Sequence, residues 1–238
     1  MAIAINVVSP KKLTRLLSGV VFFLVLANIV GQYSRYYWDH GRLCGFVWLF
    51  YGEVHGNIPH WFKAMCMLII AVILFFIYKI QKNEQARFQK HWLFLSLIFL
   101  LMNIVQSADI HNSLSPCIQS GLGVGGWFYF AWVIPAIVIV IVLGVTYLRF
   151  FINLPPRTRL LFFFAGLMYV IGAIAFEMAT AYHFTRYGDQ NFNFAVLSAF
   201  HETLKMVGLV LFIHANMDYL SSKNQPIRLF FSNDKAQP

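Results

Sequence analysis

Ionisable side chains occur inside long apolar segments of this 238-residue chain, where a charge is costly and is commonly kept for function. Carboxylate and imidazole groups in such a place can bind a divalent metal ion or carry protons. They can also form a polar network that holds helices in register. All three chemistries stay open, and no catalytic residue is identified. The candidate polar cluster or ligand-binding site comprises Asp109, His111, Glu177, His201, Glu202 and Lys205. The candidate metal ligands are His111, Glu177, His201 and Glu202.

Lys205 bears most directly on this choice, because its ammonium group can neutralise a carboxylate in place of a metal ion. Lys205 is four residues from His201 and three from Glu202, so the three side chains can interact on one helix. Glu177 is the best acid on a neighbouring helix. The sequence therefore predicts a Glu177–Lys205 contact, direct or through one water, with no metal at Glu177. A divalent metal stays the candidate cofactor, and haem is disfavoured because no second helix repeats the spacing of His201 and His214.

Six apolar segments carry these residues and must position them. The chain is 59% hydrophobic and 11% charged, whereas soluble domains are about 25% charged. This composition excludes a soluble enzyme, a disordered chain and a disulfide scaffold. About 20 apolar residues cross a bilayer as a helix. We expect helices at residues 16–34, 61–80, 92–108, 127–148, 160–181 and 192–217. The predicted fold is an all-α, six-helix integral membrane bundle, with residues 1–238 forming a single membrane domain.

Basic residues alternate between the loops, which predicts the orientation of the helices. The chain has 18 Lys and Arg residues against nine Asp and Glu residues, and we expect lipid rather than nucleic acid as the partner of this charge. One side carries Lys11, Lys12, Arg15, Lys79, Lys82, Arg87, Lys90, Arg149, Arg157, Arg159, Lys223, Arg228 and Lys235. The other side carries Arg35, Arg42, Lys63 and Arg186. The positive-inside rule then predicts that both termini are cytoplasmic. In this orientation three helices bring Asp109, Glu177 and His201 to the outer leaflet.

The first predicted outer loop, residues 33–60, is rich in Tyr and Trp, which favour the membrane interface. It is interpreted as an interfacial belt or a short helix lying flat on the membrane, or alternatively as a lid or partner surface. Cys44 and Cys117 both fall in predicted outer loops and could form a disulfide if that side is oxidising.

Residues 46–220 resemble an uncharacterised family of bacterial polytopic, six-helix integral membrane proteins. The stretches that carry the resemblance are residues 56–59, 131–135, 147–150, 154–159, 176–178 and 202–208. The resemblance implies the bacterial inner, cytoplasmic membrane as the location, and it implies no activity. His111, Glu177 and Glu202 match acidic or imidazole positions of the family pattern. Several other acidic positions are replaced, at Val105, Gln106, Asn112, His201 and Lys205. If the family site binds metal through many carboxylates, this copy is depleted.

These observations favour a non-catalytic membrane component, either an accessory subunit or a structural or interaction protein. Its partners would be the lipid bilayer and, as an accessory subunit, a larger membrane complex. The alternatives are a membrane protein that binds a divalent metal or small ligand, and a membrane metalloenzyme.

Overall fold

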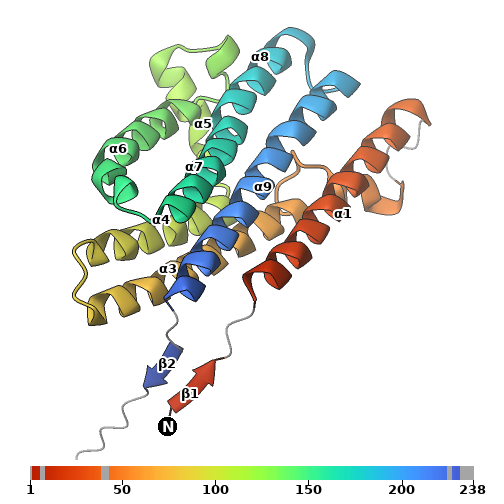
Figure 1. Ribbon diagram of the computed structural model, residues 1–238. Helices are drawn as coiled ribbons and strands as arrows, with labels where there is room; N and C mark the ends of the chain where they lie inside the picture. The colour runs from red at the N-terminus through yellow and green to blue at the C-terminus, as the bar shows by residue number, and fades with distance from the viewer. Residues whose placement is uncertain (1, 6–8, 39–42, 224–226, 231–238) are drawn as a thin grey trace, which may run out of the picture.

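The computed structural model describes residues 2–5, 9–38, 43–223 and 227–230, which form a bundle of long helices (Figure 1). Arg42 and Lys235, which contribute to the charge pattern above, lie outside the described residues.

Six helical segments of the described chain are long and apolar enough to cross a membrane, which confirms the expected number of spans. They are α1 (Pro10–Tyr37), α3 (Ile58–Asn83), α4 (Gln89–Ser107), α6 (Val133–Ile152), the segment Pro156–Tyr187, and α9 (Phe192–Ser222). The segment Pro156–Tyr187 consists of α7 (Pro156–Val170), the π-helix η3 (Ile171–Phe176) and α8 (Glu177–Tyr187). Most of these helices extend past the expected apolar windows, because polar residues and first-turn prolines also fit helix ends.

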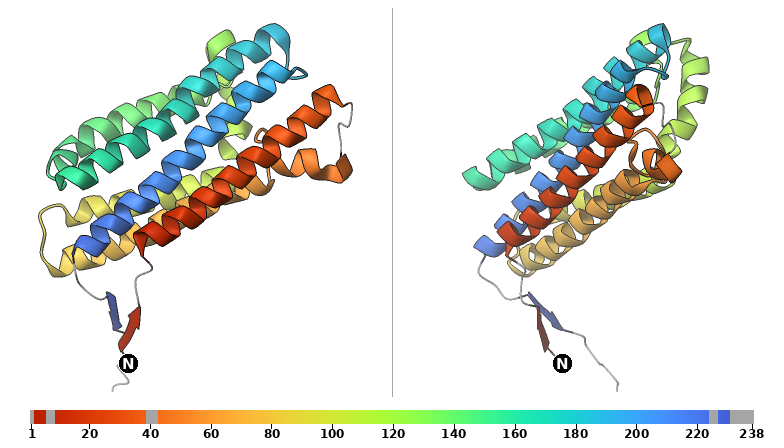
Figure 2. Two further views of the ribbon diagram at one scale, coloured as in Figure 1. Left: turned by 45° about the vertical axis from the view of Figure 1, so that its right-hand side comes forward. Right: turned by 90° about the vertical axis from the view of Figure 1, so that its right-hand side faces the viewer.

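Helices α3 and α9 form the centre of the bundle. Their side chains supply much of the buried core, including the fully buried Cys66, Ile70, Leu74 and Ile213. In Figure 2, α9 runs between α1 and the α6–α7 pair, with the α3–α4 hairpin alongside it. Gly208 of α9 allows a very close approach to α7, since an added Cβ would lie 2.8 Å from the backbone nitrogen of Tyr169. Helices α4 and α6 have few buried residues, as expected for helices that face lipid.

Short helices occupy the connections at one end of the bundle. They are η1 (Leu43–Gly45), α2 (Phe46–Phe50), α5 (Ile110–Leu122) and η2 (Gly126–Phe128). The helix expected at residues 127–148 begins and ends later than predicted. Residue 127 belongs to η2, and α6 runs from Val133 to Ile152. Gly123 and Gly126, which both have positive φ, interrupt the helical conformation between α5 and α6. Cys44 and Cys117 are exposed free thiols, so the disulfide alternative is not realised.

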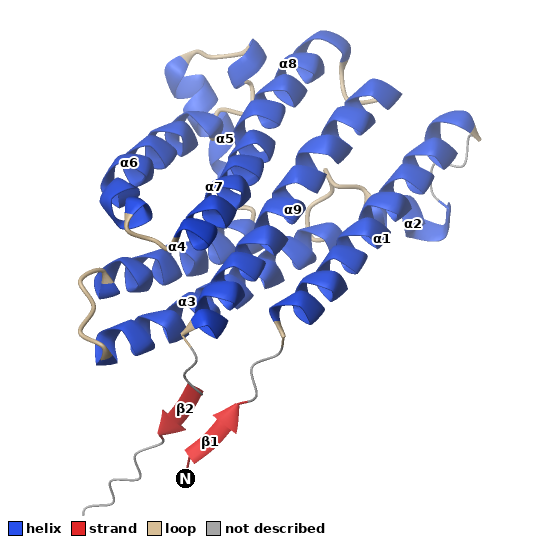
Figure 3. Cartoon of the chain, in the orientation of Figure 1, coloured by secondary structure: helices blue, strands red, loops and turns tan. Residues whose placement is uncertain are grey.

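Two short strands depart from the all-helical expectation (Figure 3). Strand β1 (Ala2–Ile5) pairs antiparallel with β2 (Ile227–Phe230), with Ala2 opposite Phe230 and Ile5 opposite Ile227. The pair lies beyond the start of α1 and the end of α9, so the two ends of the described chain meet at one end of the bundle.

Candidate functional site

The loop between α2 and α3, residues 51–57, packs against α9 and begins the site. Asn57 caps α3 by accepting a hydrogen bond from the backbone of His60 at 3.1 Å, and its amide donates to the carbonyl of Tyr51. Gly52 lies directly against Glu202, since an added Cβ would lie 2.6 Å from the Cγ atom of Glu202. Only a residue without a side chain therefore lets the loop come this close to α9, and this approach delivers Glu53 to the helix.

His201, on α9, is bracketed by two carboxylates from other parts of the chain. Its Nε2 atom lies 2.9 Å from Oε1 of Glu53, and its Nδ1 atom lies 2.9 Å from Oε2 of Glu177. Ser198, one turn earlier on α9, donates to Glu53 at 2.5 Å. A neutral imidazole has only one N–H group, so it can donate to only one of two carboxylates. The Nε2 contact is a hydrogen bond, whereas the Nδ1 contact with Glu177 is a close ion-pair contact without hydrogen-bond geometry. Two carboxylates beside a ring that is 3% exposed favour its imidazolium form through their charge.

Glu202 lies between two lysines. Lys63 of α3 contacts its Oε2 atom, and the Nζ atom of Lys205 lies 2.5 Å from its Oε1 atom. The side chains of Lys63 and Glu202 are only 4% and 5% exposed, so both charges are removed from solvent. An isolated buried charge is costly, and only close opposite charges offset that cost.

These six residues form what is called the ionic cluster below: Glu53, Lys63, Glu177, His201, Glu202 and Lys205. Three carboxylates face two ammonium groups and one imidazole. The cluster is therefore neutral when His201 is protonated and carries one negative charge when His201 is neutral. Charge balance and the two carboxylates beside the ring thus both favour the protonated form of His201.

The π-helix η3 ends immediately before Glu177 and sets where that carboxylate emerges. Gly172 within η3 touches α9, since an added Cβ would lie 2.9 Å from the carbonyl oxygen of His201. A π-turn widens the helix and shifts the direction of the following side chains, and it occurs often at functional sites. The indole of Trp132, just before α6, donates to Oε1 of Glu177 at 3.3 Å and so fixes the other carboxylate oxygen.

The structure divides the six site residues expected from the sequence. It brings Glu177, His201, Glu202 and Lys205 together in the ionic cluster. It places Asp109 and His111 in a neighbouring group at the start of α5, where Asp109 pairs with His55 at 3.3 Å and lies 3.7 Å from His111. The ring of His111 packs edge-on against Trp132, which links the two groups.

The sequence predicts a Glu177–Lys205 contact, direct or through one water, and the ion pairs of the described chain do not include a direct one. Among the described residues, Lys205 forms its ion pair with Glu202, and Glu177 forms its ion pair with His201. The reason is that Glu202 lies one turn from Lys205 on the same helix. Lys63, counted above among the basic residues of the outer side, is buried beside Glu202 near the start of α3.

Sequence reasoning missed Glu53, Lys63, Ser198 and Trp132 as members or partners of the cluster. Lys63 gave a signal, since it is a charge inside an expected membrane span. Glu53 gave none, because its position depends on the path of a loop.

Within the described chain, no group of three or more His, Cys, Asp or Glu residues has an arrangement that could hold a metal ion. The four ligands expected from the sequence, His111, Glu177, His201 and Glu202, do not form such a group. The positive charges next to the acids come from lysine and histidine side chains.

Two groups close to the ionic cluster, and outside the membrane-spanning helices, have shifted pKa values. Burial lowers the pKa of His111 below its ordinary value of 6.5, although Asp109 partly opposes this change. Burial, reinforced by the charge of Glu53, raises the pKa of Tyr51. Tyr51 is therefore a neutral part of the loop that carries Glu53.

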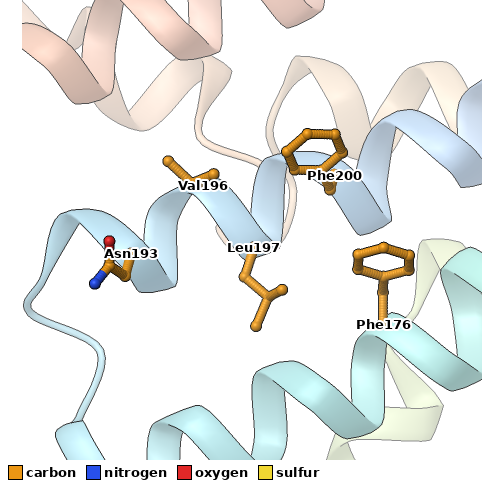
Figure 4. Close-up of a pocket in the computed structure, with 5 residues that line it drawn as sticks. All are labelled: Phe176, Asn193, Val196, Leu197 and Phe200. Carbon is orange, nitrogen blue, oxygen red and sulfur yellow. The ribbon is translucent and has the colours of Figure 1, made fainter.

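An apolar groove of about 400 Å³ is formed by side chains of η3 and α9, the elements that lead to Glu177 and His201 (Figure 4). Phe176, Asn193, Val196, Leu197 and Phe200 line it. Phe176 and Phe200 stack with ring centroids 6.3 Å apart, and each directly precedes a residue of the ionic cluster. Adjacent helix residues point in different directions, so the phenyl rings line the groove while Glu177 and His201 are buried in the cluster.

The fold and the site together define an integral membrane protein, a helical bundle with a buried ionic cluster. The chain belongs to the family described as a domain of unknown function, DUF8692, which matches residues 17–220. No curated protein and no solved structure matches the chain.

Proposed function

We propose that this chain is a non-catalytic membrane component, an accessory subunit or a structural or interaction protein. In this proposal the ionic cluster fastens the loop 51–57 to the helices. One observation carries it: each carboxylate of the cluster lies within ion-pair distance of a cationic side chain of the same chain. A network that is neutral within itself needs no metal ion to stabilise it. The loop is then a fixed outer surface that a partner protein can recognise.

The distribution of charge supports an orientation with both termini in the cytoplasm of a bacterium and the loop 51–57 outside its inner membrane. The basic residues cluster at the end of the bundle where α1 begins and α9 ends. Ion pairs between Arg157 and Asp218 and between Lys223 and Glu84 join helices at that end. A tag at either terminus should be protected from protease added outside the cell. A reporter enzyme that works only in the cytoplasm should be active when it is fused to either terminus. An externally accessible terminus would contradict the orientation.

The alternative is a membrane protein that binds a divalent metal, or a metalloenzyme, with Glu177, His201 and Glu202 among the ligands. It is supported by the gathering of carboxylates around one imidazole. It would require an ion to enter a site that already holds Lys63 and Lys205, which it would repel.

Elemental analysis of the purified full chain separates the two proposals, together with thermal unfolding in detergent with and without a chelator. We expect less than stoichiometric divalent metal and no change of melting temperature on chelation. A stoichiometric metal whose removal lowers the melting temperature would favour the alternative. A second membrane protein that co-purifies at fixed stoichiometry would support the accessory role, whereas a lone chain would support the structural role.

A further inference from the structure

A second groove lies at the opposite end of the membrane-spanning helices from the ionic cluster. It has a volume of about 300 Å³ and lies where α6 ends and α7 begins. Its lining consists of Phe151, Pro156, Arg159, Leu160 and Phe163. Pro156, Arg159, Leu160 and Phe163 follow the spacing of one helix face. The groove therefore combines an apolar surface along α7 with one cationic side chain.

The apolar face continues from the groove along α7. Leu160 and Phe163 are 57% and 51% exposed, and Leu167, one turn further, is 41% exposed. These large side chains lie on a helix long and apolar enough to span a membrane, so their surroundings are acyl chains rather than water. From Arg159 to Leu167 the face extends about 12 Å at 1.5 Å per residue.

The arginines of the α6–α7 connection are only partly compensated by carboxylates of the described chain. The connection from Arg149 to Leu160 contains three arginines and no Asp or Glu. Arg157 pairs with Asp218 at 3.0 Å, whereas no described carboxylate forms an ion pair with Arg149 or Arg159. Arg159 donates one hydrogen bond to the carbonyl of Ile152 at 3.2 Å, which holds its guanidinium over the end of α6. A guanidinium has five N–H donors, so others stay free for an anion.

We propose that the groove between α6 and α7 binds an anionic phospholipid. Arg159 contacts the phosphate, and one acyl chain lies along Leu160 and Phe163. Charge complementarity favours this occupant, because an anionic headgroup supplies the charge that the hairpin lacks and a zwitterionic headgroup does not. Basic pockets between membrane helices are suited to such headgroups. The inference depends on the chain lying in a membrane and not on the role proposed for the ionic cluster.

Native mass spectrometry of the full chain in detergent tests the proposal, with phosphatidylglycerol and phosphatidylcholine of identical acyl chains as probes. We expect phosphatidylglycerol to be retained at least fivefold better than phosphatidylcholine, and Arg159→Gln to reduce that preference about fivefold, as expected for one basic residue at a membrane surface. Arg87→Gln is the matched control, since it removes the same charge from an exposed site at the same end of the bundle. The control should keep the preference.

A second variant tests the acyl-chain half of the site independently. Leu160→Trp keeps every charge and fills the groove, and it should reduce retention of phosphatidylglycerol severalfold without changing the melting temperature in phosphatidylcholine. Arg159→Gln must also melt like the parent chain there. The proposal is overturned if the preference survives Arg159→Gln, if Arg87→Gln abolishes it equally, or if Leu160→Trp has no effect. Inorganic phosphate that competes as well as the lipid would also overturn it, in favour of a simple anion site.

Discussion

Glu53 and His201 are 148 residues apart in sequence, yet a carboxylate oxygen of one lies 2.9 Å from a ring nitrogen of the other. This contact fastens a loop to the central helix of the bundle, and it gives the first prediction. Glu53→Gln should destabilise the chain by about 1–3 kcal/mol, because it removes a charged hydrogen-bond partner of both His201 and Ser198. Thermal unfolding in detergent measures the effect. Glu84→Gln, which breaks an exposed pair with Lys223, should change stability by less than about 1 kcal/mol.

Lys205 and Glu202 should show strong energetic coupling. Lys205→Met leaves Glu202 with Lys63 as its only lysine partner and leaves the cluster with one excess negative charge, so we expect a loss of about 3 kcal/mol. The double variant Lys205→Met/Glu202→Gln restores charge balance, because Glu53 and Glu177 then face Lys63 and His201. The double variant should therefore lose less unfolding free energy than the sum of the losses of the two single variants. A double-mutant cycle measured by unfolding gives this coupling, and strict additivity would mean that the two side chains do not interact.

Gly172 and Gly144 should respond oppositely to the same substitution. A Cβ at Gly172 would lie 2.9 Å from the backbone of His201, so Gly172→Ala must separate η3 from α9 and should cost about 1–3 kcal/mol. A Cβ at Gly144, in the exposed middle of α6, meets nothing within 4 Å. Gly144→Ala should be neutral or stabilising by up to about 1 kcal/mol. Melting temperatures of the two variants decide the matter, and equal losses would mean that η3 is not packed closely against α9.

His111 should make stability depend on pH. Its pKa is lowered by burial, so between its folded pKa and about 6.5 the unfolded chain binds more protons than the folded chain. The contribution is therefore fully present above pH 6.5 and decreases as the pH falls below that value. We expect the melting temperature of the parent chain to fall from pH 7.5 to pH 5 more steeply than that of His111→Gln. Parallel curves would show that His111 does not contribute.

The sequence predicts the membrane spans well because membrane helices are specified by local composition. A run of apolar residues must satisfy its backbone hydrogen bonds within itself, so length and hydropathy suffice to locate α1, α3, α4, α9 and the segment Pro156–Tyr187. The start of α6 was predicted too early, since Trp127 is apolar and fits a membrane helix as well as a short interfacial turn. Composition alone does not separate these two cases.

The candidate site is only partly predictable, for a related reason. Glu177, His201, Glu202 and Lys205 were found because each interrupts an apolar helix, and their depth could be inferred from the helix ends. The choice of partners could not, because Lys205 can reach an acid on its own helix or on a neighbouring one, and side-chain geometry decides between them. Glu53 depends on Gly52 lying against α9, which is a tertiary contact.

The π-helix η3 has a consequence for the length of its membrane segment. A π-turn accommodates about one more residue than the α-helical turn that it replaces. Deleting Ala175, an exposed residue of η3, should therefore let the helix close into a continuous α-helix with little loss of helical content. The extra residue is held within the widened turn, so its removal would leave the residues on either side of η3 facing their present directions, and Glu177 would keep its contact with His201. The same deletion in a purely α-helical stretch would turn everything before it by about 100° relative to everything after it. The π-turn thus lets this membrane segment carry one more residue without changing which faces its two halves present.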